Sequence, residues 1–330
     1  MKIIYNPETF RHKPGMELLN GRRYAHAESP GRYQSIMRAL RRWPEAEFVK
    51  AGAASWQDVA AVHGPEYIQF LRAVDKQKIY PSVWGVIPPD WRSADLTRMA
   101  GAFVSDVYTP VSKEATTAAV AAAGVALVGA GLVAVGEQVA YALCRPPGHH
   151  AGIARAGGYC YLNNAALAAN KLSRTGRVAI FDFDFHHGNG TQEIFYGRND
   201  VLYVSIHAQT PEAFPHFSGF AQERGQGQGK GYNFNFPVAA TVTDAQYAKV
   251  LARAMAKIRH FKPDYLVVSA GFDLHKDDPI GGMRITERTI ATLGSAVATL
   301  GLPTLVVQEG GYNTATLGNL ALTFLRQLEP

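Results

Sequence analysis

The chain is poor in cysteine. Only Cys144 and Cys160 occur among its 330 residues, which are too few for a disulfide framework. It also contains no low-complexity run, internal repeat or linker-like segment, and residues 1–5 predict a first strand rather than the apolar core of a signal peptide. Residues 1–330 are therefore expected to form a single domain. The lack of both a signal and a disulfide framework predicts a reducing, cytoplasmic location.

Charge is absent from residues 115–136, a run long enough to cross a bilayer. Alanine and glycine dominate this run and no aromatic anchors flank it, so a buried helix packed on a sheet is favoured and no membrane association is expected. The formal net charge is +6. The basic clusters Arg22-Arg23 and Arg41-Arg42 are short and lack interleaved aromatic residues, which favours a solvated basic face over nucleic-acid binding.

Apolar strand-like segments alternate with helix-like segments along most of the chain. The predicted strands are residues 1–5, 138–144, 177–183, 200–206, 264–269 and 303–308. The predicted helices are residues 33–42, 56–62, 66–74, 115–136, 164–172, 191–196, 244–260 and 315–328, and residues 14–32 and 79–95 are expected to be long loops. This alternation predicts an α/β fold, with a mostly parallel central sheet covered by helices on both faces. Reactive groups are then expected at the carboxyl ends of the strands.

The residues that follow the strand at 177–183 have the pattern of a metal site. Alternate residues of a strand share a face, so Asp182, Asp184 and His186 are expected to project together. A surface strand with salt-bridged acids is the alternative, but the surrounding residues are too apolar for it. Asp184, His186 and Asp273 would supply three ligands and leave one position for water, as in catalytic zinc sites. Two carboxylates and one imidazole also suit Fe²⁺ or Co²⁺.

Two adjacent histidines, His149 and His150, are candidates for proton transfer because imidazole titrates near neutral pH. Asp182 would hold one imidazole and favour its charged form, whereas Asn189 would orient the other without charging it. Taken alone, such a pair is often an ordinary loop feature. Tyr312 follows two glycines and is a candidate hydrogen-bond donor to a developing oxyanion. A tyrosine in that position is more often a packing residue.

Five separated motifs together resemble the histone deacetylase superfamily. They are residues 145–150, 157–164, 182–190, 270–273 and 309–312. The resemblance implies an arginase-like fold and a zinc ion held by Asp184, His186 and Asp273. It also implies that His150 is the general base and acid, that His149 acts electrostatically with Asp182, and that Tyr312 polarises the amide carbonyl.

Within that superfamily, residues 16–18, 144–152 and 214–219 look like the bacterial acetylpolyamine amidohydrolases. This resemblance implies that the loop after the first strand narrows the entrance and promotes a homodimer, and that Glu17 meets a cationic substrate. Tyr159 and Phe214 match the aromatic pair that walls the tunnel. The other residues expected at the tunnel are Gly158, Ile280, Gly310 and Gly311. Structural potassium ions are implied at Asp182, Asp184, His186, Ser205 and Ile206, and at Phe195, Arg198 and Val201.

Two features depart from the polyamine enzymes. Tyr108, with Asp106 nearby, occupies the place of a further glutamate, and residues 272–282 look more like the protein deacetylases. The expected function is nevertheless deacetylation of a small acetylated amine, most simply an acetylpolyamine, with acyl-lysine on a protein as the alternative. A two-metal ureohydrolase is less favoured because Asn189 and His275 stand where further carboxylates are expected. A binding protein without catalysis is also disfavoured, because no ligand, histidine or tyrosine of the set is missing.

Overall fold

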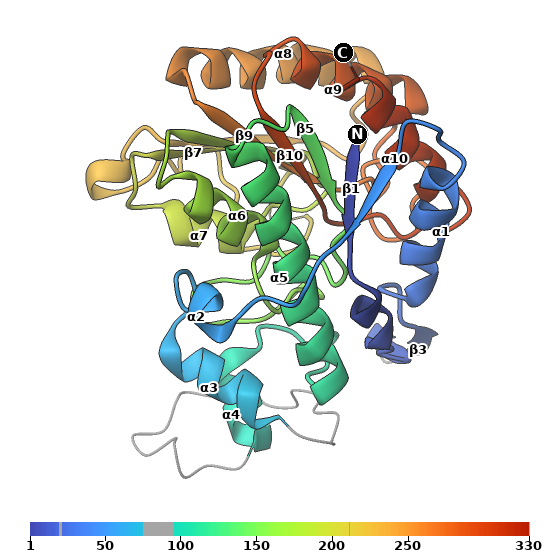
Figure 1. Cartoon of the computed structure of the whole chain (residues 1–330), viewed down its shortest axis with the longest axis vertical. Coiled ribbons are helices and arrows are strands. Elements are labelled where there is room, and N and C mark those ends of the chain that lie inside the picture. The colour runs from blue at the N-terminus through green and yellow to red at the C-terminus, as the bar shows by residue number, and fades with distance from the viewer. Residues whose placement is uncertain (20–21, 75–95, 211, 330) are drawn as a thin grey trace.

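A computed structural model describes residues 1–19, 22–74, 96–210 and 212–329 of the chain (Figure 1). Its centre is an eight-stranded sheet in the order β4-β1-β5-β10-β9-β6-β7-β8, in which every neighbouring pair is parallel. The strands are β1 (Lys2–Tyr5), β4 (Glu47–Lys50), β5 (Val139–Ala142), β6 (Val178–Asp182), β7 (Val201–Ala208), β8 (Asn233–Val238), β9 (Tyr265–Ala270) and β10 (Thr304–Gln308). The predicted α/β fold with a parallel sheet is confirmed.

The helices connect successive strands. They are α1 (Pro30–Leu40), α2 (Trp56–Val59), α3 (Pro65–Ala73), α4 (Leu96–Phe103), α5 (Lys113–Ala134), α6 (Asn164–Leu172), α7 (Asn189–Phe195), α8 (Asp244–Phe261), α9 (Glu287–Ala298) and α10 (Leu317–Arg326). Two short 3₁₀ helices, η1 (Pro7–Arg11) and η3 (Gly227–Gly229), are also present.

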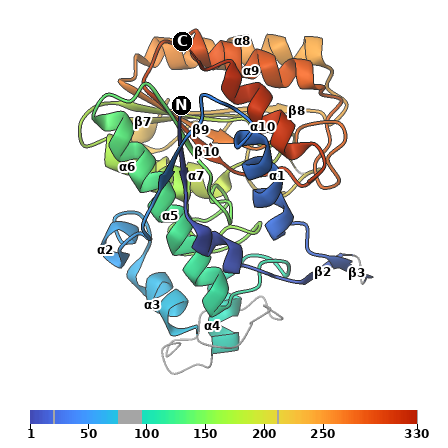
Figure 2. The same cartoon turned by 45° about the vertical axis from the view of Figure 1, so that its right-hand side comes forward.

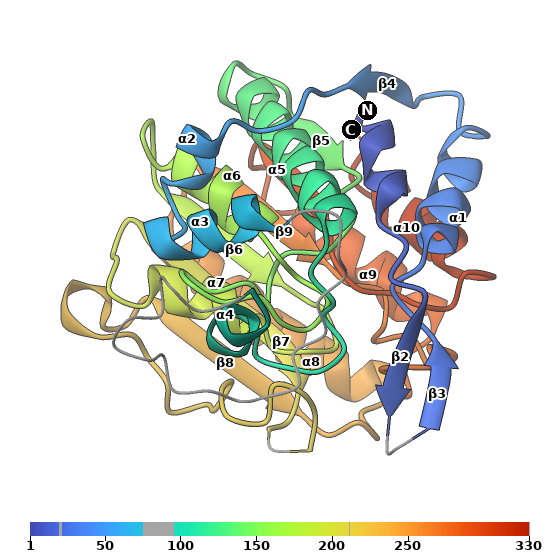
Figure 3. The ribbon, with the colours of Figure 1, turned by 90° about the horizontal axis from the view of Figure 1, so that it is seen from below.

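Alternate side chains of the central strands pack into two cores, one on each face of the sheet. On one face, Phe181 and Val268 pack with apolar side chains of α1, α8, α9 and α10. On the other face, Ile180 and Val267 pack with α5, α6 and α7. Figure 3 shows these two helix layers on opposite sides of the strands. Both faces are covered, which explains why the central strands are continuous apolar runs.

Helix α5 is the charge-free run, and it belongs to the core. By length and composition alone it could cross a membrane, but 61% of its most apolar window is buried. It packs against β1, β5 and β10. A Cβ atom at Gly124 would overlap the backbone at Gly52, and one at Gly129 would overlap Leu305. The glycines therefore allow the close approach that the sequence predicted for this helix.

The N-terminal region differs from the prediction. Residues 14–32 were expected to form a loop, but β2 (Met16–Leu19) and β3 (Arg22–Ala25) form an antiparallel hairpin and α1 begins at Pro30. The hairpin extends away from the rest of the chain (Figure 2), and all four residues of β3 are exposed. An exposed strand has no buried apolar face, so its sequence lacks the alternation that marks a strand. The predicted loop at residues 79–95 lies outside the described residues.

Two edge strands, β4 and β8, were also missed. Strand β4 has no buried residue, and β8 carries two asparagines and Pro237. Edge strands need neither a full apolar face nor a complete set of backbone donors, so a search for buried apolar runs overlooks them.

A buried ion cluster joins the N-terminal region to the loop after β5. The side chains of Glu28, Arg32 and Arg145 are at most 2% exposed. Arg145 Nε and Arg32 Nη1 donate to Glu28 Oε1 at 2.8 and 3.0 Å. Burial opposes ionisation of Glu28, but Arg145, His12 and Arg32 hold its pKa below the ordinary value. The buried charges of this cluster compensate one another only while all of them are present.

We therefore expect Glu28→Gln to lower the free energy of unfolding by about 3–5 kcal/mol, because two buried guanidinium groups would lose their counter-charge. Urea unfolding followed by circular dichroism measures this loss. The control is Glu8→Gln, which removes an exposed pair with Arg11 and should cost less than about 1 kcal/mol. Equal losses in the two variants would contradict the role assigned to Glu28.

Candidate active site

The candidate active site lies at the carboxyl ends of four neighbouring strands, β5, β10, β9 and β6. His149 and His150 follow β5, Tyr312 follows β10, and Asp273 follows β9. Asp182 ends β6, and Asp184 and His186 come directly after it. Parallel strands end at one edge of a sheet, so the topology brings together residues that are far apart in the sequence. All seven residues of the predicted catalytic and metal-binding sets are therefore neighbours.

Asp184, His186 and Asp273 form the candidate metal centre. One ligand atom from each lies within 4.8 Å of the other two, and no other such group occurs in the described residues. Backbone amides of Gly310 and Phe185 donate to Asp184 Oδ2 and Asp273 Oδ1 at 2.8 and 3.0 Å. The backbone amide of His186 also donates to Asp184 Oδ1 at 2.9 Å, and Asp273 Oδ2 lies 3.0 Å from His186 Nδ1. Backbone amides thus hold both carboxylates beside the His186 ring.

The charges of this cluster fit a bound cation. Burial and the neighbouring Asp184 carboxylate raise the pKa of Asp273 to about 7. Two carboxylates that share a buried site repel each other, and a divalent cation between them would remove this repulsion. Two oxygens and one nitrogen are also a donor set that Zn²⁺ accepts, with a position left for water. The residues present therefore fit the metal that the sequence predicted.

The two histidines lie side by side but have different partners. Their ring centroids are 4.1 Å apart. His149 Nδ1 lies 3.2 Å from Asp182 Oδ2, which also accepts a 2.9 Å hydrogen bond from the Tyr203 hydroxyl. Burial lowers the pKa of His149, but Asp184 and Asp182 outweigh it and raise the pKa to about 10. His149 is therefore the charged member of the pair.

His150 is the neutral member. Its Nδ1 lies 2.8 Å from Asn189 Oδ1. An amide oxygen only accepts, so Nδ1 carries the hydrogen and Nε2 keeps a free lone pair. Burial, and then the positive charges of His149 and His186, hold the pKa of His150 well below its ordinary value. The separate partners predicted from Asp182 and Asn189 are thus present, and His150 has the properties of a general base.

Tyr312 lines the same pocket as His150, and contacts with Asp278 and Arg32 hold it in place. Its backbone amide donates to Asp278 Oδ2 at 2.6 Å. The Arg32 guanidinium lies 4.7 Å from the centre of its ring, and Arg32 Nε donates to the Gly311 carbonyl at 2.6 Å. Burial raises the pKa of Tyr312 well above its usual value. The phenol therefore keeps its proton and can donate a hydrogen bond.

A cavity of about 380 Å³ leads to these groups. His150, Tyr159 and Phe185 are its buried lining residues, and Glu212, His216 and Pro279 are exposed at its rim. Four of the predicted tunnel residues line it: Gly158, Tyr159, Phe214 and Ile280. Gly158 has φ of 53°, and a Cβ atom there would overlap the ring of His150. This position therefore requires glycine for both reasons.

Three other predicted tunnel residues lie behind the wall. Gly310 donates to Asp184, and Gly311 lies against Phe272 and Leu317. The expectation that Glu17 meets a substrate directly is corrected. Its side chain is 4% exposed, and its Oε2 accepts a 2.7 Å hydrogen bond from the Tyr159 hydroxyl. Glu17 thus holds an aromatic wall residue in place and does not line the cavity.

Tyr108 and Asp106, the pair that departs from the polyamine enzymes, also lie at this site. Tyr108 lines the cavity. Asp106 is buried and accepts hydrogen bonds from the backbone amides of Gly158 and Tyr108 at 2.5 and 2.9 Å. Asp106 therefore fixes the wall, and Tyr108 provides part of its surface.

The predicted potassium positions fall in two groups. Asp182 and Ser205 are paired between β6 and β7, close to Asp184, His186 and Ile206. Phe195, Arg198 and Val201 span the turn between α7 and β7, where the Arg198 amide donates to the Phe195 carbonyl at 3.0 Å. Both potassium sites remain predictions.

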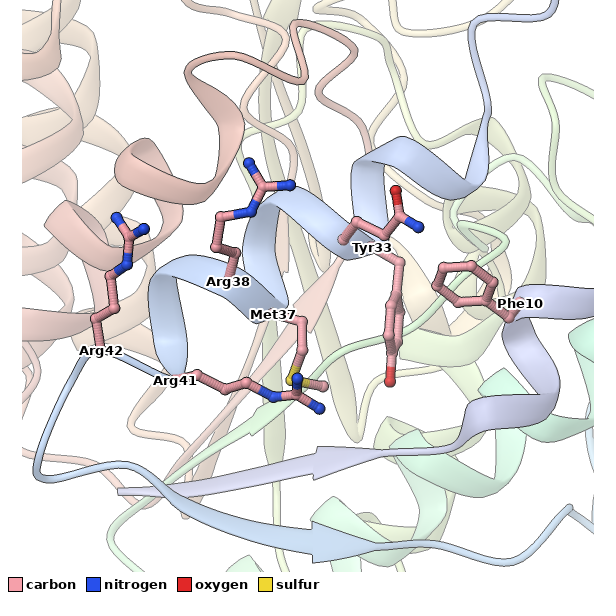
Figure 4. A pocket seen from close by; sticks show the side chains of 7 residues that line it. Phe10, Tyr33, Met37, Arg38, Arg41 and Arg42 are labelled. Carbon is pink, nitrogen blue, oxygen red and sulfur yellow. The ribbon is translucent and has the colours of Figure 1, made fainter.

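A second cavity of about 580 Å³ lies between α1 and η1, where the rings of Phe10 and Tyr33 pack edge to face. Its lining residues are Phe10, Tyr33, Gln34, Met37, Arg38, Arg41 and Arg42. Figure 4 shows Arg38 and Arg42 pointing to one side of the helix, whereas Arg41 runs beside Met37 toward Tyr33. The three cations do not converge on one point, and none of the described residues that line this cavity is an acid or a histidine, so the catalytic groups belong to the smaller cavity.

Sequence reasoning missed three residues of the site. Glu309 is fully buried and its Oε2 accepts from the amides of Gly148 and His149 at 2.7 and 3.1 Å. Its position directly after β10 was a usable signal. Arg32 gave none, because it lies on a helix that is remote in sequence from the strand ends. Glu212 lies in the loop four residues after β7 ends at Ala208, so its position was a usable signal as well.

Several known proteins are similar to this chain. The family model of the histone deacetylase domain matches residues 26–328. An acetylpolyamine amidohydrolase of Burkholderia pseudomallei is 38% identical over 98% of this chain and 97% of that protein. One of Mycoplana ramosa is 36% identical over 96% of each chain. The crystal structure of acetylpolyamine aminohydrolase from Burkholderia pseudomallei has a TM-score of 0.94 at 36% identity and covers 99% of this chain and 98% of its own.

We expect Asp273→Asn to reduce the bound divalent metal to a small fraction of the parent's content, because a neutral amide replaces one of two anionic ligands. Elemental analysis after dialysis against limiting zinc measures this content. Asp278→Asn is the control, since Asp278 lies outside the ligand group and its variant should retain the metal. In addition, added zinc should raise the melting temperature of the parent but not of Asp273→Asn. Equal metal contents would rule out the proposed ligand set.

Proposed function

Because this chain belongs to the histone deacetylase family, we propose that its substrate is a small N-acetylated amine, most simply an acetylpolyamine. The family makes it a deacetylase, a hydrolase of amide bonds. The observation that carries the proposal is the cavity wall, which is aromatic and contains no lysine or arginine among the described lining residues. Such a wall admits a slim chain that carries a positive charge.

The protein's own groups account for the proton transfers. When bound, a divalent cation at Asp184, His186 and Asp273 supplies a Lewis acid that polarises the amide carbonyl and makes water more acidic. His150 Nε2 takes a proton from the attacking water as the new C–O bond forms. It then gives a proton to the amine nitrogen as the C–N bond breaks, which releases acetate and the free amine.

Two further groups stabilise the charges that develop. The protonated Tyr312 phenol donates to the carbonyl oxygen as that oxygen becomes negative, an effect of roughly 10²-fold or more in rate. His149, held charged by Asp182, places a positive charge 4.1 Å from the His150 ring, centroid to centroid. This charge keeps the resting His150 neutral and therefore able to accept a proton.

The alternative substrate is an acyl-lysine side chain on a protein. It is favoured by residues 272–282, which resemble the protein deacetylases and contribute the apolar Ile280 and Pro279 to the cavity. The relatives named acetylpolyamine amidohydrolase, which match this chain over nearly its full length, support the small amine instead.

The cofactor and assembly belong to the same proposal. Zinc is the metal that suits the ligand set best, with Fe²⁺ and Co²⁺ as alternatives, and potassium is proposed at the two main-chain groups near β6 and β7. A homodimer through the β2–β3 hairpin is supported by Met16 and Tyr24, which are 45% and 47% exposed on it. We also propose a cytoplasmic location.

The deciding experiment compares kcat/KM for acetylputrescine, acetylspermidine and an acetyl-lysine peptide. We expect the two polyamines to be preferred by tenfold or more, a difference of about 1.4 kcal/mol in transition-state binding. A tenfold preference for the peptide would assign the chain to the protein deacetylases.

Replacing each of the two histidines should change the pH dependence of kcat/KM in a different way. His150→Ala removes the base, so kcat/KM should fall by roughly 10²–10⁴-fold. The lowered pKa of His150 places the parent's acid limb below the ordinary histidine range, where protonation removes the base, and this limb should disappear in the variant. His149→Ala should keep an acid limb but move it to higher pH, because the charge that lowers the pKa of His150 is lost, and it should also lose rate. An unchanged pH profile in His150→Ala would exclude His150 as the base.

A further inference from the structure

We propose that Glu212, which the sequence did not single out, selects substrates by binding their free ammonium group at the rim of the catalytic cavity. This inference rests on the proposed function and names the residue that gives it specificity. Its ligand is the terminal ammonium of an N-acetylated diamine or polyamine.

Glu212 is the one carboxylate among the described residues that line the cavity. The other acidic groups nearby are turned inward. Glu17 accepts from Tyr159, Asp106 accepts from Gly158, and both side chains are at most 4% exposed. Among the described residues that line the cavity, a cationic chain therefore meets a carboxylate only at Glu212.

A hydrogen bond from Gln209 orients the Glu212 side chain, but its negative charge has no cationic partner among the described residues. Gln209 Nε2 donates to Glu212 Oε1 at 2.6 Å, and the Glu212 amide donates to the Gln209 carbonyl at 3.2 Å. Within the described part of the chain, no lysine, arginine or histidine forms an ion pair with Glu212 and no hydrogen bond occupies its Oε2. An oriented carboxylate without a cationic partner is suited to a charged ligand.

The depth of the cavity separates the two ends of the substrate. His150 is buried beside the candidate metal ligand His186, where the acetamide must react, whereas Glu212 is exposed at the rim. Tyr108, Tyr159, Phe214 and Tyr312 line the path between them. Their ring faces attract cations and apolar methylene groups, so they tolerate the aliphatic part of a polyamine and its charge. A carboxylate at the rim then distinguishes an amine from a neutral amide of equal length.

The test uses acetylputrescine and N-butylacetamide, which differ by one terminal ammonium group. In Glu212→Gln, we expect KM for acetylputrescine to rise roughly fivefold, the effect of losing one exposed ion pair, with kcat retained. KM for N-butylacetamide should stay within twofold. The parent's preference for the cationic amide should also weaken with added salt, and that of the variant should not.

Glu193→Gln is the matched control, because it removes the same charge from an exposed position outside this cavity. It should leave both KM values unchanged. If Glu212→Gln changes neither substrate, or both equally, the selection role is overturned. If the parent hydrolyses neither amide, the proposed function fails, and calorimetric binding of the two amides still decides the point: equal affinities would overturn the role of Glu212, and a preference for the cation that is lost in Glu212→Gln would support it.

Discussion

Buried negative charge at the carboxyl ends of the central strands is the constraint on which the site depends. Asp182, Asp184, Asp273 and Glu309 are each at most 1% exposed. Burying an ionised carboxylate is costly unless hydrogen bonds or positive charges compensate it. Here backbone amides donate to Asp184, Asp273 and Glu309, and His149 faces Asp182. The Asp184 and Asp273 carboxylates still repel each other in this buried site, and a cation bound between them would remove that repulsion.

The same charges give the two histidines different protonation states and therefore different roles. His149 faces two carboxylates and keeps its proton, whereas His150 faces an amide oxygen and loses it. The rings are neighbours, so the charge on the first also suppresses the charge on the second. A single substitution of aspartate for asparagine at position 189 would weaken this difference, because a carboxylate would favour the charged form of His150.

The central fold and the reacting groups could be predicted from the sequence because both leave strong local signals. Strand β6 is an unbroken apolar run that ends in Asp182, and the turn after β10 carries Gly310, Gly311 and Tyr312. The hairpin strand β3 and the edge strand β4 could not be predicted, because none of their residues is buried. Strand β8 was missed because two asparagines and Pro237 interrupt its apolar pattern. The contact of Arg32 with the Tyr312 ring could not be predicted either, since only tertiary packing brings α1 onto that ring. Tertiary packing also decides which side chains are buried. The sequence therefore did not show that Glu17 lies behind the cavity wall.

The different burial of Glu17 and Glu212 shows how specificity can be separated from catalysis in this fold. A carboxylate that contacted substrate from behind the wall would have to break its hydrogen bond with Tyr159 and would disturb the tunnel. A carboxylate on the rim loop is free of that restraint, because its partner Gln209 belongs to the same loop. The rim can therefore change its charge without moving the metal ligands or the histidines, which are fixed by the strand ends. Substrate choice can vary along this loop while the chemistry beneath it stays constant.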